Sequence, residues 1–206
     1  MANLGLNTMN VALNHTRNRI GLTIIAVMLS ACASVGSGPS ATGGPGKAGA
    51  VTPPSLGLFS SIKVPSDREP TLQFSAQGVQ IFRCEKRDGG FAWVFRQPEA
   101  QLSDASGKPV GRHGASFSFE HNDGSRLVAS VAAYDEAPNA ADLRWLLLTT
   151  RSYGKGVFDG VTHVQRVNTR GGMPPGKCDA AQANQLLRVD FSGDFVFYRA
   201  RSGAAG

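Results

Sequence analysis

Hydrophobic and polar residues alternate with a period of two along most of the chain beyond residue 70. Two such runs, 79–84 and 91–96, lie on either side of Asp88-Gly89-Gly90, a turn sequence typical of β-hairpins. Further strand-like runs, most of them beside a turn rich in Gly, Asn, Asp or Pro, are 100–104, 110–113, 116–120, 127–134, 161–167 and 189–197. Many short strands separated by turns predict an all-β fold, either an antiparallel β-barrel or a β-sandwich.

Three segments depart from simple alternation. Residues 143–150 are apolar on both faces, which indicates a strand that is covered from both sides. Residues 179–187 form the one short helical segment that we expect, and Asp179 is a suitable N-cap for a helical turn or two. Gly193 interrupts the last strand pattern and indicates a bulge or a bend there.

The N-terminal residues have the pattern of an export signal. Arg17 and Arg19 precede the apolar run 22–29, which is far shorter than the ~20 residues needed to cross a bilayer. The sequence L-S-A-C at 29–32 resembles a bacterial lipobox, in which the chain is cut before the cysteine and the thiol then receives a diacylglycerol. We therefore expect lipidation at Cys32.

Acylation of Cys32 would anchor the chain to a membrane, because each buried methylene contributes about 0.8 kcal/mol. The second residue after the cysteine is Ser34 and not aspartate, which favours the outer membrane of a Gram-negative bacterial cell envelope. The alternative is a plain secretory signal that is cut near residues 31–33.

Composition divides the chain into four parts. Residues 1–31 are the expected lipoprotein signal peptide. Residues 32–55 are rich in Gly, Ser and Pro and lack the bulky apolar groups that a core needs, so we expect a flexible tether. Residues 56–201 carry the strand patterns and predict a single β-rich domain, and residues 202–206 predict a disordered tail.

Two cysteines, Cys84 and Cys178, remain once Cys32 is assigned to the lipid. A pair of cysteines in an exported chain predicts a disulfide. Free thiols or a metal site are the alternatives, but two isolated cysteines without a C-x-x-C neighbour make a poor zinc site.

The charge excludes some partners. The chain has 21 Lys and Arg against 15 Asp and Glu, a net charge of +6, and two of the arginines belong to the leader. Basic residues are interspersed with acidic ones, which is typical of a solvated surface, so nucleic acid is not an expected partner. The expected partners are the membrane, through the lipid anchor, and a small molecule, a glycan or an envelope protein.

Catalytic motifs are absent from the sequence. It contains no G-x-x-x-x-G-K-[ST], no H-E-x-x-H and no G-x-S-x-G. His113, His121 and Asp123 offer two imidazoles and a carboxylate to a divalent metal. Ser125 with His113 and Asp123 offers a nucleophile, a base and an orienting carboxylate. D-G-S is also a common turn whose aspartate bonds its own backbone, and we predict neither a metal nor a cofactor.

A barrel or sandwich of this size can hold a small ligand in its mouth, lined by aromatic side chains and a few polar groups. The candidate ligand-binding residues are Trp93, Arg112, His113 and Tyr134. The alternative is that the tryptophans simply fill the core. The favoured hypothesis is a noncatalytic binding module; the other hypotheses are a hydrolase that uses His113 and Asp123, and a structural envelope protein.

Four phrases of the sequence resemble a secreted family of bacteria and fungi, the domain-of-unknown-function family numbered three-four-five-five. They are LQFSAQGVQIFRC (72–84), WVFRQPEAQLSDASGKPVGRH (93–113), VQRVNTRGGMPPGKC (164–178) and VDFSGDFVFYR (189–199). The resemblance covers nearly all of 65–199 and implies an extracytoplasmic β-rich domain without an established activity. After residue 113 this family continues with A-G-P and a tryptophan, whereas this chain reads G-A-S-F-S-F-E-H-N. We therefore expect any site around that loop to be altered here.

Overall fold

The computed structural model describes residues 51–203, which form eight β-strands and two single turns of 3-10 helix. The strands are β1 (Arg68–Arg87), β2 (Gly90–Ser103), β3 (Pro109–Gly114), β4 (Ser118–His121), β5 (Arg126–Asp135), β6 (Trp145–Tyr153), β7 (Val161–Gly171) and β8 (Leu186–Ala200). The 3-10 turns are η1 (Ala115–Phe117) and η2 (Ala180–Gln182). The expected signal peptide, Cys32 and most of the expected tether lie outside the described residues, as do residues 204–206. No helix in the described part is long and apolar enough to cross a lipid bilayer.

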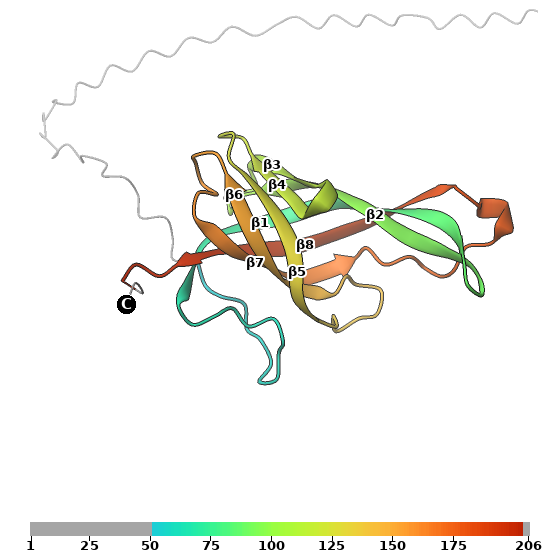
Figure 1. Cartoon of the computed structure of the whole chain (residues 1–206), viewed down its shortest axis with the longest axis horizontal. Coiled ribbons are helices and arrows are strands. Elements are labelled where there is room, and N and C mark those ends of the chain that lie inside the picture. The colour runs from blue at the N-terminus through green and yellow to red at the C-terminus, as the bar shows by residue number, and fades with distance from the viewer. Residues whose placement is uncertain (1–50, 204–206) are drawn as a thin grey trace, which may run out of the picture. The chain divides into compact units, whose positions relative to one another are not determined.

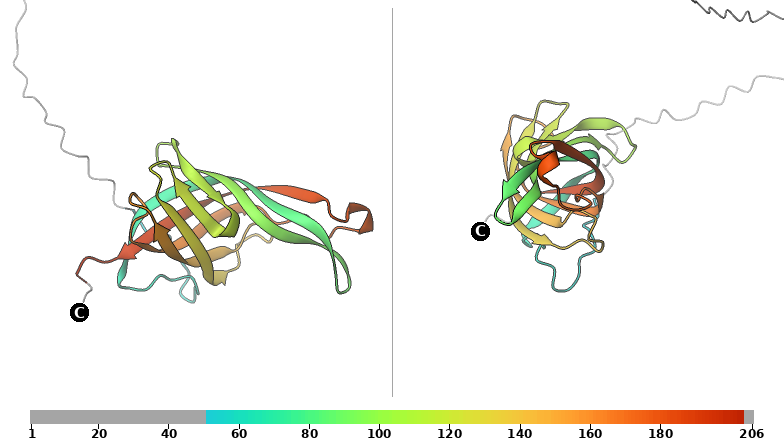
Figure 2. Two further views of the ribbon diagram at one scale, coloured as in Figure 1. Left: turned by 45° about the horizontal axis from the view of Figure 1, so that its top comes forward. Right: turned by 90° about the vertical axis from the view of Figure 1, so that its right-hand side faces the viewer.

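Each strand pairs antiparallel with the next, and β8 pairs with β1, so that the sheet closes into a barrel. Seen from the side of the long β1–β2 hairpin, the strands form a ring (Figure 2, right). Closure removes the open sheet edges that a sandwich would have to protect. The all-β prediction is confirmed, and of its two architectures the chain adopts the barrel.

The hairpins lie at the turns that the sequence predicts. Gly89 and Gly90 take φ values of 89° and 132° between β1 and β2, a conformation that glycine adopts without steric cost. The far parts of β1 and β2 extend beyond the ring as a twisted ribbon, and the start of β8 accompanies them (Figure 1). The other predicted turns join β2 to β3 and β4 to β5.

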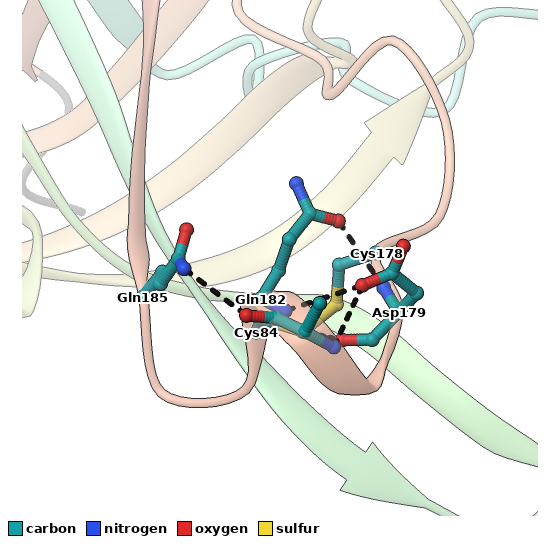
Figure 3. Close-up of a disulfide and its surroundings, with 6 residues drawn as sticks. Cys84, Cys178, Asp179, Gln182 and Gln185 are labelled. Carbon is teal, nitrogen blue, oxygen red and sulfur yellow. Dashed lines mark hydrogen bonds between the residues drawn. A yellow bond between two sulfur atoms is a disulfide. The ribbon is translucent and has the colours of Figure 1, made fainter.

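A disulfide joins Cys84 of β1 to Cys178 of the loop before β8, with a Cα–Cα distance of 6.0 Å (Figure 3). The predicted pairing is therefore confirmed. The loop is fixed further by backbone hydrogen bonds between Cys84 and residues 184–185. The disulfide and these hydrogen bonds thus hold Cys178 and residues 184–185 against the part of β1 that contains Cys84.

The predicted helical segment is only one turn long. Asp179 caps η2 as expected, because its carboxylate accepts hydrogen bonds from two backbone N–H groups of that turn. Leu186 and Leu187 then pair with β1, so strand pairing replaces the helical pattern in the second half of 179–187.

The core fills the barrel with side chains from alternate positions of the strands. Four phenylalanines of this core are nearly or fully buried, namely Phe119, Phe158, Phe195 and Phe197. Their rings pack edge to face or tilted, with centroids of Phe119 and Phe195 5.0 Å apart. Most of the barrel interior is therefore a packed core and not a channel.

The strand that is apolar on both faces is β6. Leu146 and Leu148 point into the barrel core, whereas Leu147 lies on the outside. Residues 56–64 cross this outer face and cover it, with Ile62 fully buried against Leu147. The backbone carbonyl of Ile62 also accepts a hydrogen bond of 2.6 Å from the side-chain amide of Gln165 in β7. The prediction of a strand covered from both sides is therefore correct.

The irregularity expected at Gly193 of β8 lies in the neighbouring strand. The register of β7 against β8 shifts between Val167 and Arg170, and Asn168 takes a φ of 52° at the bulge. A Cβ atom at Gly193 would lie 3.2 Å from the Thr169 side chain. Gly193 thus makes room for a bulge in β7 and does not itself bulge.

Candidate ligand-binding pocket

The two ends of the barrel are built differently. We call the end that carries the β4–β5 turn and the β6–β7 loop the closed end. There Phe158 is fully buried, and its ring centroid lies 5.1 Å from that of Phe197 and 6.2 Å from that of Phe74. The opposite end, beside η1 and the loops 136–144 and 172–185, is called the open end, because a pocket lined mainly by apolar side chains lies there. The closed end has a smaller hollow of about 280 Å³ beside the β4–β5 turn.

The pocket at the open end has a volume of about 430 Å³, within the range of roughly 300–1,000 Å³ typical of small-molecule sites. Strands β1, β2, β5, β6 and β7, turn η1 and both loops contribute to it. Its lining residues are Gln80, Phe82, Phe95, Pro98, Phe117, Val131, Tyr134, Leu143, Arg144, Leu146, Arg166 and Met173. Most of these side chains are apolar, so the pocket favours a mainly apolar guest.

Four large apolar or aromatic side chains around the pocket are exposed, and we call them the rim. They are Phe95, Val131, Tyr134 and Met173, which are 40–50% exposed. Exposed apolar side chains that gather around one hollow mark an interaction site more often than scattered ones do. The rim thus distinguishes this hollow from the rest of the surface.

Arg144 adds a charged group beside the rim. Its guanidinium lies 4.4 Å from the ring centroid of Tyr134, and its Nε lies 2.9 Å from a carboxylate oxygen of Glu136. The hydrogen bond and charge of Glu136 raise the pKa of Arg144. The charge of Arg144 is therefore already paired.

Arg166 is the charged group deeper in the pocket. Its side chain is inward on β7, 7% exposed, between Leu146 of β6 and Phe195 of β8 in the strand register. Its Nε and Nη2 donate hydrogen bonds to the backbone carbonyl of Arg144, at 3.3 and 2.9 Å. Among residues 51–203, no carboxylate lies within ion-pair distance of it. Burial lowers its pKa to about 10, so it remains charged at neutral pH.

Two buried polar side chains accompany Arg166. Gln80 lines the pocket and is 2% exposed, and its Nε2 has no hydrogen-bond partner among the described residues. His113 lies next to the pocket, with its ring 6.3 Å from that of Phe117, and its Nδ1 is 2.9 Å from the carbonyl of Ser118. Burial, helped by the Arg166 charge, lowers the pKa of His113 to about 4 although the Ser118 bond opposes it. His113 is thus neutral at pH 7, and Arg166 is the buried charge.

One wall of the pocket has an unusual backbone. Ser116 and Phe117 of η1 take positive φ values of 56° and 48°, and Phe117 lines the pocket. Residues other than glycine adopt this conformation at a cost of roughly 1–2 kcal/mol each. Such strain concentrates at functional sites. This is also the loop at which the sequence departs from the pattern it resembles.

The four sequence-predicted ligand residues do not share one site. Tyr134 belongs to the rim, and His113 lies buried beside the pocket. Arg112 points outward from β3 and binds Glu120, with its Nε 2.9 Å from the carboxylate. Trp93 lies on the β1–β2 ribbon opposite Cys84. The alternation of inward and outward residues along β3 is the reason that neighbours Arg112 and His113 separate.

Sequence reasoning missed Arg166, Gln80 and Phe117. Gln165 and Arg166 are both buried, one on the outside beneath residues 56–64 and one inside. A run with two adjacent buried polar residues gives no period-two signal for which of them points inward. The only available signal for Arg166 was its position two residues after Val164, which is fully buried in the core.

The candidate catalytic residues lie apart. Asp123 is at the closed end, where its Oδ1 accepts hydrogen bonds from the hydroxyl and N–H of Ser125 at 2.6 and 2.9 Å. Its Oδ2 accepts a bond of 2.7 Å from the N–H of Val157. His113 shares none of these contacts. The arrangement of Ser125, His113 and Asp123 that the sequence suggested is not formed.

The closed-end contacts show a structural network. Ser125 is fully buried, and its hydroxyl also accepts a bond of 3.3 Å from the N–H of Phe158. Nδ1 of His121 lies 3.0 Å from Asp123. Burial raises the pKa of Asp123, but the bonds from Ser125, Val157 and His121 outweigh it and hold the pKa far below its usual range. Within residues 51–203, no three His, Cys, Asp or Glu side chains are grouped as metal ligands.

The fold and pocket together define a closed eight-stranded antiparallel barrel with a small-molecule-sized pocket at one end. A family model described as a protein of unknown function (DUF3455) matches residues 65–199, and the chain belongs to this family. The match begins just before β1 and ends one residue short of the end of β8, so it covers the whole barrel. No curated protein and no solved structure matches the chain.

Proposed function

We propose that this chain is a lipid-anchored protein of the bacterial cell envelope whose barrel binds a small, mainly apolar molecule at its open end. The observation that carries the binding proposal is the pocket of about 430 Å³ surrounded by the exposed rim. Covering apolar surface stabilises a complex by roughly 25 cal/mol per Å². A guest that covers the four rim side chains therefore gains affinity from surface that folding leaves in water.

The anchor proposal rests on the sequence. The run 22–29 and the lipobox-like residues 29–32 support export and acylation at Cys32, and Ser34 supports the outer membrane. The Cys84–Cys178 disulfide is consistent with an oxidising compartment outside the cytoplasm. An anchor at a membrane would place the barrel near a source of apolar molecules.

Lipid analysis of the purified protein tests the binding proposal. The full chain is expressed in a Gram-negative bacterium, extracted in a nonionic detergent and analysed for co-purifying small molecules by mass spectrometry. The variant carries Val131→Gln and Met173→Gln, which make the rim polar without adding charge. Leu186→Gln is the matched control, because Leu186 is 58% exposed but does not line the pocket.

We expect a defined small molecule with the wild-type chain and the Leu186 control, and its loss from the rim variant. Equal amounts with all three chains, or none with any, would contradict the proposal. Anchoring is tested separately by labelling cells with a clickable fatty acid. Label on the wild-type chain and none on Cys32→Ser is expected, and label retained on Cys32→Ser would overturn the anchor site.

A further inference from the structure

Arg166 is a charge that the fold itself does not neutralise. A buried ion costs several kcal/mol unless it is paired. Arginine carries five N–H donors, and the described residues provide Arg166 with one backbone carbonyl, which receives two of them. A carbonyl could be satisfied by a neutral donor, so this contact does not explain why the buried residue is a permanent cation.

Gln80 provides a second, independent observation. It comes from β1, whereas Arg166 comes from β7, and both line the same pocket. Its Nε2 is buried without a partner among residues 51–203, although buried polar atoms normally have one. Two strands thus contribute donor-bearing side chains to the pocket lining, and the described residues give these two side chains one acceptor, the Arg144 carbonyl.

The other neighbours do not supply the missing negative charge. His113 is neutral, and the other cation that lines the pocket, Arg144, is already paired with Glu136. The remaining lining residues are mostly apolar. The pocket therefore combines an apolar rim with one deep, uncompensated positive charge.

We infer that the ligand is an amphipathic carboxylate such as a medium-chain fatty acid, whose carboxylate accepts hydrogen bonds from Arg166 and Gln80 while its alkyl chain contacts the rim. A carboxylate presents two oxygens in the plane that the guanidinium fork matches. This inference rests on the proposed binding function and specifies its ligand class. The inference adds a requirement for a negatively charged head group, which the apolar rim alone does not impose.

Photo-crosslinking tests the inference. The full chain in a nonionic detergent at pH 7.5 is labelled with decanoic acid that carries a diazirine on its alkyl chain, and labelled peptides are identified by mass spectrometry. Decanoate, decanol and decylammonium then compete with the probe. These three share one alkyl chain and differ in head-group charge, so the comparison isolates the charge.

We expect label on peptides of the pocket, and competition by decanoate at least about tenfold stronger than by decanol, because charge-assisted hydrogen bonds are the strong ones. Decylammonium should compete least. In Arg166→Met the advantage of decanoate over decanol should disappear, while decanol still competes. Arg188→Met is the matched control, since Arg188 is exposed and bound to Glu99 outside the pocket. Partition into micelles cancels when the decanoate-to-decanol ratios of two chains are compared.

The outcomes separate the two proposals. Equal competition by decanol and decanoate on the wild-type chain would overturn the carboxylate inference and leave the apolar binding function standing. Absence of label from the pocket with the acid probe and with the matching diazirine alcohol would overturn both. The wild-type comparison needs no variant, so it decides the question even where Arg166→Met fails to fold.

Discussion

Asp123 at the closed end and Arg166 at the open end are two charged side chains whose hydrogen-bonding needs are met to very different extents. At the closed end, the carboxylate of Asp123 is surrounded by donors from Ser125, Val157 and His121. At the open end, Arg166 meets one carbonyl and Nε2 of Gln80 meets no partner in the described part of the chain. An unpartnered buried polar group costs roughly 1–3 kcal/mol, so folding alone favours the first arrangement. Buried atoms without a partner among the described residues also occur at the closed end, at Nε of Arg68 and of Arg199, so the contrast concerns the two charged side chains and not every polar atom of the two ends. It supports a ligand role for Arg166 and a structural role for Asp123.

The backbone beside the pocket also differs from that of the closed end at one place. At the closed end, left-handed positions are glycines: Gly124 has a φ of 87°, and Gly156 has a φ of 143° with the place of its missing Cβ only 2.3 Å from the Asp123 carboxylate. Beside the pocket, Ser116 and Phe117 take positive φ values. The open end also has glycines at such positions, Gly171 and Gly172, with φ values of 67° and 94°. The difference is therefore confined to η1, where two residues other than glycine take this conformation beside the pocket.

The largest expected difference between the ends is in aromatic packing. Phe158→Ala should lower the free energy of unfolding by about 4 kcal/mol, because it empties a fully buried position. Phe95→Ala should lower it by about 1 kcal/mol, since that side chain is 40% exposed at the rim. Urea unfolding of the full chain, followed by circular dichroism, measures both. Losses of equal size would remove the distinction between the two ends.

A pH effect follows from His113 at the open end. Its folded-state pKa of about 4 lies below the ordinary value of 6.5, so the unfolded chain binds more protons between these values. Stability is therefore full above pH 6.5 and falls as the pH is lowered towards 4, by about 3 kcal/mol from this residue. His113→Gln should flatten the unfolding free energy over that interval. An unchanged slope in the variant would show that His113 is not the group responsible.

A smaller effect tests the closed-end network. Asp123→Ala should lower the free energy of unfolding by about 2 kcal/mol, because the N–H of Val157 and the hydroxyl of Ser125 lose their acceptor. The control is Asp159→Ala, which removes an exposed ion pair with Lys155 and should change stability by less than about 0.5 kcal/mol. Thermal melting of both variants makes the comparison. Equal melting temperatures would contradict a structural role for Asp123.

The fold was largely predictable because its signals are local. Turn residues such as Asp88-Gly89-Gly90 and alternation along the strands specify hairpins without knowledge of distant contacts. The Cys84–Cys178 pair followed from the number of cysteines and the expected compartment. Barrel closure was not distinguishable from a sandwich, because it depends on the pairing of β1 with β8 across the chain.

The pocket was much less predictable, because it depends on which face of a strand points inward. Tyr134 was chosen for its aromatic character and lines the pocket, whereas Arg166 was hidden beside Gln165 in a strand whose register shifts at both ends. Arg112 was chosen with His113 because the two are adjacent, but adjacent strand residues face opposite sides. The sequence indicated which kinds of residue a pocket needs. It could not indicate which residues of those kinds face the interior of the barrel.

The measurement that tests the account most directly combines stability and binding in Arg166→Met. If Arg166 serves a ligand, replacing the uncompensated buried charge with an apolar side chain of similar length should leave the unfolding free energy unchanged or raise it by about 1 kcal/mol. The same variant should lose the preference for decanoate over decanol. A destabilised variant that keeps this preference would contradict the account, because it would make Arg166 a structural residue of the barrel.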